Sequence, residues 1–448
     1  MTEVRDQNDV ARAHVALDAK ALRYTMLWQY YDGVQPLVYS TERLRSIFQS
    51  INVRFSENWC GAVVNAATDR LNLTGFAVSG DDDATEYLAG LFEDANLGLE
   101  SDDVHLAMLV CGEAFVIAWK EDAGEVDAYY NDPRLVHVQY DADNPRRMAW
   151  AAKRWVADDD TYRLTMYYPD HIEYYYTTAK AENVTDAQAY MPAEIPSAAN
   201  PYGKIPVFHF RRATRATRSE LGDVIPLQDA VNKLFADMMV AAEFGAFRQR
   251  FVISDSDVSQ LKNAPNELWN IPAGSGEGQG TSVGEFAQTD LGMYLSAMDR
   301  LAVTIAVITR TPKHYMLAQG GDPSGEALIT MEAPLTRKVE RYRERASATW
   351  KQVAAFMSLL AGRPIEAEDV TPVFDPIETT QPFTAAQTGV LKNQLGVSHK
   401  QLQRELGYTD SQIEQIATER AEQGAALGAQ LLGAFDHGDD TDGEDGLE

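Results

Sequence analysis

The chain has 448 residues, of which 45% are hydrophobic, so it is long enough to form about two to four folded units. Its 67 acidic residues outnumber 39 lysines and arginines, and the formal net charge is −28. Proteins that hold nucleic acid statically use Lys and Arg to displace counterions from phosphate, so this balance excludes an ordinary DNA-binding module. Two isolated cysteines, Cys60 and Cys111, exclude a disulfide framework and a cysteine-rich zinc site.

The amino-terminal segment is polar and carries acidic residues, which is not the pattern of a signal peptide. The most apolar long stretch, residues 291–310, has Asp299 and Arg300 at its centre. Because central charges are costly in lipid, this pattern indicates a helix packed in a core or an oligomer. We therefore expect no membrane partner and assembly in a cytosol.

Helices and a sheet are predicted in the first half of the chain. Apolar residues recur at helical spacing over 9–32, 58–71 and 81–94. From about 104 to 180 the sequence changes to β-branched and aromatic runs separated by turn residues, which predicts an antiparallel sheet. The scattered histidines of this region and the strand after it are expected in the core: His105, His137 and His209.

The second half is mainly helical. Residues 219–247 carry one apolar stripe in steps of three and four, formed by Val224, Leu227, Val231, Leu234 and Met238. Residues 248–287 interrupt this pattern, and a helix over 291–310 is expected to end before Pro312. A further helix over 325–360 would be roughly 50 Å long, with a kink at Pro334. The helices expected over 219–247 and 291–310 are too apolar for single surface helices, and they predict a ring of head-to-tail contacts.

The loop "TPKHYMLAQGGDPSGEAL" (311–328) resembles a phosphate-binding loop only at first sight. In a Walker loop a lysine follows the glycines directly at the helix start, whereas Lys313 precedes them and Glu326 follows Gly325. The glycines of 274–280 lack the strand–turn–helix context of a dinucleotide loop. With no HExxH, GxSxG or histidine cluster either, the sequence predicts no catalytic residue, no metal site and no cofactor.

Five segments in this order resemble the portal proteins, or head-to-tail connectors, of tailed siphophages: 30–37, 58–76, 200–212, 219–241 and 322–340. The resemblance implies a non-enzymatic virion protein that forms a twelve-subunit ring at one capsid vertex. Such a ring passes double-stranded DNA during packaging and ejection, without sequence specificity. Its implied partners are the terminase large subunit, the head–tail adaptor, and the major capsid and scaffolding proteins.

The resemblance also implies an α+β fold with a mixed α/β wing, a two-helix stem, a small clip, a long spanning helix and an α-helical crown. In residue numbers these parts are wing 1–218, stem helices 219–247 and 288–311, clip 248–287, tunnel loop 312–324, long wing helix 325–361, connector 362–384, crown 385–435 and a disordered acidic tail 436–448.

Site residues follow from the same resemblance. The tunnel loop that passes close to DNA comprises Lys313, His314, Tyr315, Met316, Leu317, Gln319, Gly320, Gly321 and Asp322. The candidates for the channel wall, where acidic side chains repel phosphate, are Asp229, Asp237, Glu285, Asp290 and Asp299. The stem packs through the stripe of 219–247, and the clip meets its partners through Trp269, Ile271, Gly274 and Gly276.

Alternatives stay open at this point. The loop after Pro312 is either a DNA-contacting loop or a plain linker between helices, and Lys313 either contacts phosphate or caps the preceding helix. The chain is alternatively another virion ring component, such as an adaptor or capsid protein. An acidic hydrolase that uses paired carboxylates in the β-rich region would instead have a carboxylate with a raised pKa in a pocket. The helix faces that line the lumen and the subunit count in isolation are open as well.

Overall fold

The computed structural model describes residues 7–36, 57–121, 124–214, 216–246, 250–253, 282–285, 290–317 and 324–377, together with single positions between 392 and 420. The chain divides into two compact units, Met1–Ile377 and Glu378–Glu448. Every element described below belongs to the first unit. In the second unit, the described positions include the buried side chains of Leu402 and Ile413, both within helical residues.

The amino-terminal part contains helices α1 (Gln7–Tyr31), α3 (Trp59–Thr68), α4 (Asp82–Asp94) and α5 (Leu97–Val110). The first three confirm the expected helices. The Asn58 side chain accepts a hydrogen bond from the Gly61 N–H and so caps α3, and Asp81 caps α4 in the same way. Helix α5 occupies residues where a strand region was expected to begin. It is buried on several faces, so its apolar residues show no one-sided helical period.

Two antiparallel sheets follow, which confirms the predicted sheet region but divides it. One has the order β3–β2–β9 and the other runs β4–β5–β6–β7–β8. Their strands are β2 (Glu113–Lys120), β3 (Val126–Asn131), β4 (Val136–Tyr140), β5 (Met148–Val156), β6 (Thr161–Tyr167), β7 (His171–Lys180), β8 (Tyr190–Ala199) and β9 (Val207–Arg211). In β7, Tyr175 is buried while Tyr174 and Tyr176 are half-buried, as a strand with one wetter face requires.

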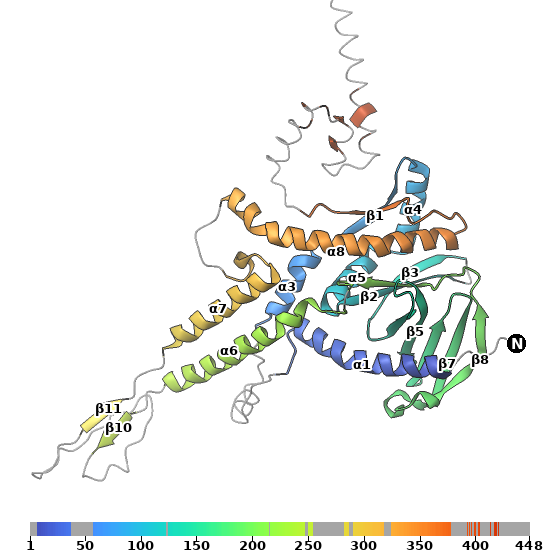
Figure 1. The fold of residues 1–448 in the computed structure, drawn as a ribbon. Coiled ribbons are helices and arrows are strands. Elements are labelled where there is room, and N and C mark those ends of the chain that lie inside the picture. Colours follow the sequence, from blue (N-terminus) through green and yellow to red (C-terminus); the bar gives the residue numbers. More distant parts are fainter. Residues whose placement is uncertain are drawn as a thin grey trace, which may run out of the picture. The chain divides into compact units, whose positions relative to one another are not determined.

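Helix α8 (Gly325–Leu360) runs beside both the three-stranded sheet and the two-stranded sheet formed by β1 (Leu73–Val78) and β12 (Val370–Phe374) (Figure 1). The helix is continuous through Pro334. Trp350 is fully buried, and its indole N–H donates to His105 Nε2 over 3.0 Å. Burial lowers the pKa of His105 to about 4, so the ring stays neutral and accepts this bond. The expectation of a core histidine is confirmed here.

Helices α6 (Ile225–Ala246) and α7 (Leu291–Thr309) lie side by side, and a hairpin of β10 (Arg250–Ile253) and β11 (Ser282–Glu285) lies at one end of the pair (Figure 1). The stretch before α6 is a short 3₁₀ helix, η3 (Glu220–Asp223). Helix α7 ends with Arg310 in the left-handed conformation, directly before the Thr311–Pro312 step.

By length and composition, α7 is apolar enough to cross a membrane, and 22% of the most apolar stretch of this helix is buried in the subunit. A single helix of this kind in the described part of the chain is weak evidence for a membrane protein, because core helices pass the same test.

A buried carboxylate joins α1 to both sheets. The Glu113 carboxylate accepts hydrogen bonds from Lys20 Nζ (2.6 Å), Tyr24 Oη (2.7 Å) and His209 Nε2 (3.0 Å). His209 Nδ1 in turn lies 3.0 Å from the Tyr140 hydroxyl of β4. Burial by itself would raise the pKa of Glu113. The hydrogen bond from His209 and the charge of Lys20 outweigh it, so the pKa lies well below the usual value. His209 therefore belongs to a polar network within the interior.

We expect Glu113→Gln to lower the free energy of unfolding by about 2–3 kcal/mol at pH 7, because Lys20 loses its charged partner in a buried site. Because the pKa of Glu113 is lower in the folded state than in the unfolded state, its carboxylate stabilises the fold fully only above the unfolded pKa. This stabilisation is lost as pH falls toward the folded pKa, so the difference in free energy of unfolding between the variant and the parent protein should shrink below pH 4.5. Urea unfolding at several pH values measures this. Glu121→Gln, at an exposed position after β2, is the control and should change little.

Candidate functional site

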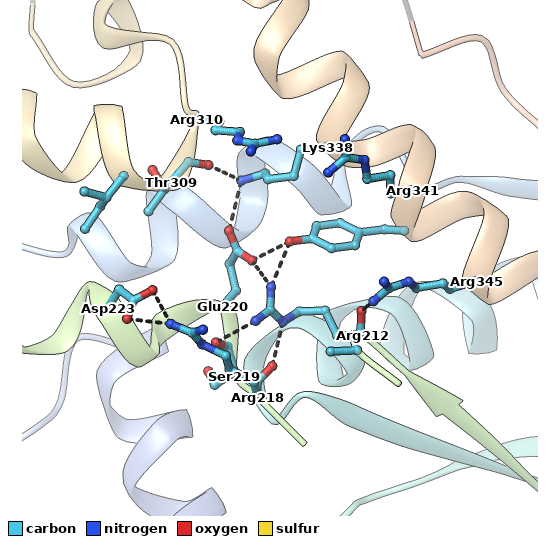
Figure 2. Close-up of a pocket in the computed structure, with 13 residues that line it drawn as sticks. Arg212, Arg218, Ser219, Glu220, Asp223, Thr309, Arg310, Lys338, Arg341 and Arg345 are labelled. Carbon is cyan, nitrogen blue, oxygen red and sulfur yellow. Dashed lines mark hydrogen bonds and ion pairs between the residues drawn. The ribbon is translucent and has the colours of Figure 1, made fainter. Parts of the chain in front are cut away.

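A buried carboxylate holds η3, α7 and α8 together (Figure 2). Glu220 Oε1 accepts from Lys338 Nζ at 2.9 Å, and Oε2 accepts from Arg212 Nη1 at 2.8 Å and from the Tyr342 hydroxyl at 2.6 Å. Lys338 Nζ also donates to the carbonyl of Thr309, the last residue of α7, over 2.6 Å. Burial and the neighbouring Glu220 raise the pKa of Tyr342, so its hydroxyl stays a donor. The junction of three helical elements therefore depends on one glutamate.

The backbone before η3 is tied to the core by a close approach. The Ser219 hydroxyl donates to the Val110 carbonyl at 2.6 Å and accepts from the Leu221 N–H at 3.0 Å. Gly112 has φ +89°, and a Cβ at this position would lie 2.7 Å from the carbonyl carbon of Arg218. Only glycine fits there without moving the backbone, so the end of α5 positions the start of η3.

Beside Glu220 lies a cavity of about 290 Å³ between η3, the end of α7 and α8. Six basic side chains line it: Arg212, Arg218, Arg310, Lys338, Arg341 and Arg345. The two acidic residues of its lining, Glu220 and Asp223, are already paired, Asp223 with Arg218 at 2.6 Å. We call this cavity the basic pocket. Its excess of positive charge contrasts with the acidity of the whole chain.

The first part of the predicted tunnel loop is attached to the body of the subunit. Lys313–Tyr315 form a short 3₁₀ helix, η4, in which Lys313 is exposed. The Tyr315 hydroxyl accepts from Arg70 Nη2 at 2.8 Å and donates to Glu332 Oε1 at 3.1 Å, and His314 Nε2 lies 3.9 Å from the same oxygen. Within the described residues, the Lys313 side chain does not donate to the carbonyls at the end of α7. The backbone N–H groups of Arg310 and Thr311 contact those carbonyls instead.

Met316 and Leu317 differ from the expectation for loop residues. Met316 is buried, and Leu317 packs half-buried against the main core. Burial within the subunit stabilises these two apolar side chains, and their assignment to a DNA-contacting loop stays a prediction. Gln319, Gly320, Gly321 and Asp322 lie outside the described residues, as do the clip candidates Trp269, Ile271, Gly274 and Gly276.

The channel-wall candidates mostly have partners within the subunit. Asp229 accepts from the Tyr30 hydroxyl at 2.8 Å, and burial raises the pKa of its carboxyl group. Asp237 pairs with Lys233 one turn earlier, and Asp290 caps α7 by accepting from the Gly292 N–H at 2.8 Å. Asp299 is half-buried, and Glu285 is exposed at the end of β11. The assignment of these acids to a channel wall stays a prediction.

The stem stripe divides into two parts. Val224 and Val231 are fully buried within the subunit, whereas Leu227, Leu234 and Met238 are half-buried. Gln228 and Asn232, which lie between them in sequence, are buried as well. The Gln228 side chain accepts from the Trp59 N–H at 2.8 Å and donates to the Glu57 carbonyl at 2.6 Å. The base of α6 is thus fastened to the segment before α3 by polar contacts as well as by the apolar stripe.

The Glu220 network is the part of the site that the sequence analysis missed. Lys338 and Tyr342 are more than a hundred residues from Glu220, so spacing along the chain cannot join them to it. One signal was available. Lys338 falls among Leu335, Val339 and Tyr342 of the apolar stripe of α8, and a lysine on a buried helix face calls for a buried acid.

A comparison with protein families identifies the family of this chain. Residues 16–425 match the family described as "Phage portal protein, SPP1 Gp6-like". The chain belongs to the phage portal protein family. Its fold is accordingly α+β, and portal proteins are structural components of the virion and not enzymes.

Curated relatives agree with this assignment. This portal protein is 24% identical to the portal protein of Mycobacterium phage D29 over 413 residues, 84% of this chain and 81% of that one. It is 23% identical to the portal protein of Mycobacterium phage L5 with the same shares. Among solved structures, it is similar to the neck of an empty gene transfer agent particle computed with C6 symmetry, with 14% identity and a TM-score of 0.48 over 83% of this chain and 95% of that chain.

Groups that an enzyme would use are unfavourably placed in the described part of this portal protein. No cluster of three or more His, Cys, Asp or Glu suits a metal ion there. Burial raises the pKa of Cys60 to about 12, which keeps it a thiol. Burial and Asp103 raise the pKa of Asp102, beside a cavity of about 550 Å³. These two aspartates lie on helix α5, and it is the family match that makes this chain a structural virion protein and not a hydrolase.

We expect Lys338→Met in this portal protein to lower the free energy of unfolding by about 3–5 kcal/mol. The variant leaves the Thr309 carbonyl without its donor and Glu220 with one cation fewer in a buried site. Thermal denaturation, followed at the unfolding transition of the first unit, measures the change in the free energy of unfolding. The neighbouring Arg337→Met, at an exposed position of the same helix, is the control. Equal stability of both variants would contradict the structural role given to the Glu220 network.

Proposed function

We propose that this protein assembles into a dodecameric ring at one vertex of the capsid, and that double-stranded DNA passes through the ring during packaging and ejection. The observation that carries the proposal, together with family membership, is the outer face of α7. Met293, Val307 and Ile308 lie on one side of the helix by their spacing and are 64%, 71% and 46% exposed in the single subunit, and Leu295, on another side, is 52% exposed. Helix α6 packs beside α7, whose buried residues include Met298, Ala302 and Ile305.

An apolar helix that stands free on one side needs a cover, because exposed apolar surface favours association. A neighbouring subunit can supply it. If each subunit covers α7 of the next, the contact joins two different surfaces, and a closed ring follows when the rotation closes on itself. The α6–α7 pair is then the stem of the ring.

The other parts take the roles expected from the sequence. Residues 1–218 and the long helix α8 form the wing, and residues 248–287 form the clip that docks the terminase large subunit and later the head–tail adaptor. Residues 312–324 form the tunnel loop, and 385–435 form the crown within the capsid. The major capsid and scaffolding proteins are the partners of the ring during head assembly.

The charge of the chain suits a conduit that does not hold its cargo. A net charge of −28 per subunit repels phosphate, so DNA slides past instead of adhering. Among the described residues of the loop region, Lys313 is exposed and available for brief phosphate contacts. The candidates for the acidic wall are Asp229 and Asp237 on the first stem helix, Asp290 and Asp299 on the second, and Glu285 at the end of β11.

Native mass spectrometry and electron microscopy of the purified protein test the proposal first. A closed ring near twelve times 49.7 kDa, with a central hole wide enough for a duplex, is the expected result. A stable monomer at high concentration, with or without scaffolding protein, contradicts it. A closed ring without such a hole favours a different ring component of the virion.

Replacing exposed apolar residues of α7 by aspartate should block assembly. We expect the double variant Val307→Asp, Ile308→Asp to stay folded, because both side chains are exposed in the subunit. The fraction of protein in rings should fall roughly tenfold, because the aspartates would be buried without partners at the interface. Native mass spectrometry gives the ring fraction, and circular dichroism verifies the fold. Val156→Asp, at an exposed position at the end of β5, is the matched control and should assemble normally. Rings in the double variant would show that this face of α7 is not an interface.

Shortening the tunnel loop should separate assembly from DNA handling. We expect deletion of residues 318–321 to leave ring formation intact, because the deletion spares Leu317, which packs against the core. Packaging or retention of DNA should fall in an assay that supplies terminase and ATP. Normal packaging by the shortened ring would favour the plain-linker interpretation of this segment.

A further inference from the structure

The basic pocket beside Glu220 is lined by more positive side chains than the two carboxylates in its lining can pair with. Figure 2 shows Arg310 and Arg341 near Lys338, with Arg345 on the same helix as Arg341. Arg345 contacts the Arg212 carbonyl. Among the described residues, neither Arg310 nor Arg341 has a hydrogen bond or an ion pair through its guanidinium group.

Carboxylates close by in sequence do not neutralise these arginines. Glu340 and Glu344 are exposed on α8 and form no ion pair with any described residue. Arg341 and Arg345 stand four residues apart, where like charges destabilise a helix. Glu220 and Asp223 already have their cations. The crowding of guanidinium groups in the free subunit is therefore uncompensated, and an anion from outside would relieve it.

The surroundings of the pocket favour a protein as the source of that anion. Ile308 lines the pocket, and Val307 beside it is 71% exposed. A DNA backbone offers phosphates to the arginines but does not bury these apolar side chains. A protein surface offers carboxylates and apolar cover together, as the polar rim and apolar core of an interface do.

The described part of the chain also has a cavity of the opposite charge. Asp69, Asp102 and Asp103 line a cavity of about 550 Å³ that has no lysine or arginine in its lining. All three aspartates are exposed to solvent, and partial burial together with the neighbouring Asp103 raises the pKa of Asp102. The cavity lies between α1, α3 and α5, and it shares no helix with the basic pocket. A head-to-tail contact needs two different and complementary surfaces on each subunit.

We propose that the basic pocket binds carboxylates of a second copy of this chain, and that the cavity of Asp69, Asp102 and Asp103 supplies them. This inference rests on the proposed ring. It names a polar contact that would set the register between neighbouring subunits, next to the apolar cover of α7. Charged pairs at an interface contribute more to specificity and rate of association than to raw affinity.

Charge reversal tests the proposal in the full chain. In Arg310→Glu with Arg341→Glu, the ratio of ring to monomer should fall roughly tenfold or more relative to the parent protein, because carboxylates would face carboxylates. Arg337→Glu makes the same change on an exposed part of α8 outside the pocket and should assemble like the parent. Adding Asp102→Lys and Asp103→Lys to the double variant should restore the rings. Native mass spectrometry in ammonium acetate measures all four proteins.

Each outcome separates this inference from the proposed function. If the parent protein forms no ring, the proposed function fails. If the parent forms rings and the double variant forms them equally well, only the pocket proposal fails. If the double arginine variant loses its rings and the added Asp102→Lys and Asp103→Lys changes do not restore them, the assignment of the aspartate cavity is overturned. Intact rings of the double variant that package less DNA in the assay with terminase and ATP would overturn the proposal in favour of a phosphate site.

A covalent measurement does not depend on assembly yield. In Arg341→Lys, a water-soluble carbodiimide should activate a carboxylate of the neighbouring copy, and the new amine should displace the resulting urea to form an amide. Dimers on a denaturing gel and a linked peptide that contains Asp102 or Asp103 are the expected result. Arg337→Lys is the control and should give far fewer dimers. Links within one chain, or none, would overturn the proposal.

Discussion

The buried Glu220 carboxylate is the constraint on which the central part of this portal protein depends. Three donors from two separate segments converge on it, and Lys338 extends the network to the last residue of α7. Taking these charges out of water is expensive, and the attraction between them roughly returns that cost. A network of this kind is therefore better understood as fixing geometry than as adding stability. It fixes how η3, the last residue of α7 and the turn of α8 that carries Lys338 and Tyr342 meet.

The same junction relates the proposed stem to the proposed tunnel loop. Helix α7 ends at Thr309, and η4 begins four residues later, held by Arg70 and Glu332 through the Tyr315 hydroxyl. A displacement of α7 would therefore be felt at Lys338 and at the start of the loop.

Charge is unevenly distributed in the subunit, and this matters for a ring. An acidic chain tends to repel its copies as it repels DNA. In the proposed ring, contact between the exposed apolar residues of α7 and a neighbouring subunit would oppose that repulsion, and a basic pocket facing an aspartate cavity would oppose it at one defined position. The same subunit surface would then combine low adhesion to DNA with specific association between subunits.

Much of the fold could be read from the chain because it follows from local periodicity. The stripes of α6 and α8, the turn-separated strands and the Thr311–Pro312 helix end all express side-chain spacing that recurs within a few residues. Helix α5 could not be read in this way, since it is buried on several faces and lacks a one-sided pattern. The family resemblance likewise came from ordered local motifs, and the family match bears it out.

Tertiary structure alone decided the functional geometry. Glu220 meets Lys338 and Tyr342, and Glu113 meets Lys20 and His209, across separations of about a hundred residues. The tertiary structure also buries Met316, which was expected in an exposed loop, and it brings Tyr30 to Asp229, a partner that local spacing does not reveal. The physical reason is the same in each case: a buried charge or an apolar side chain is satisfied by whatever the fold brings near it, and that neighbour is not encoded in local spacing.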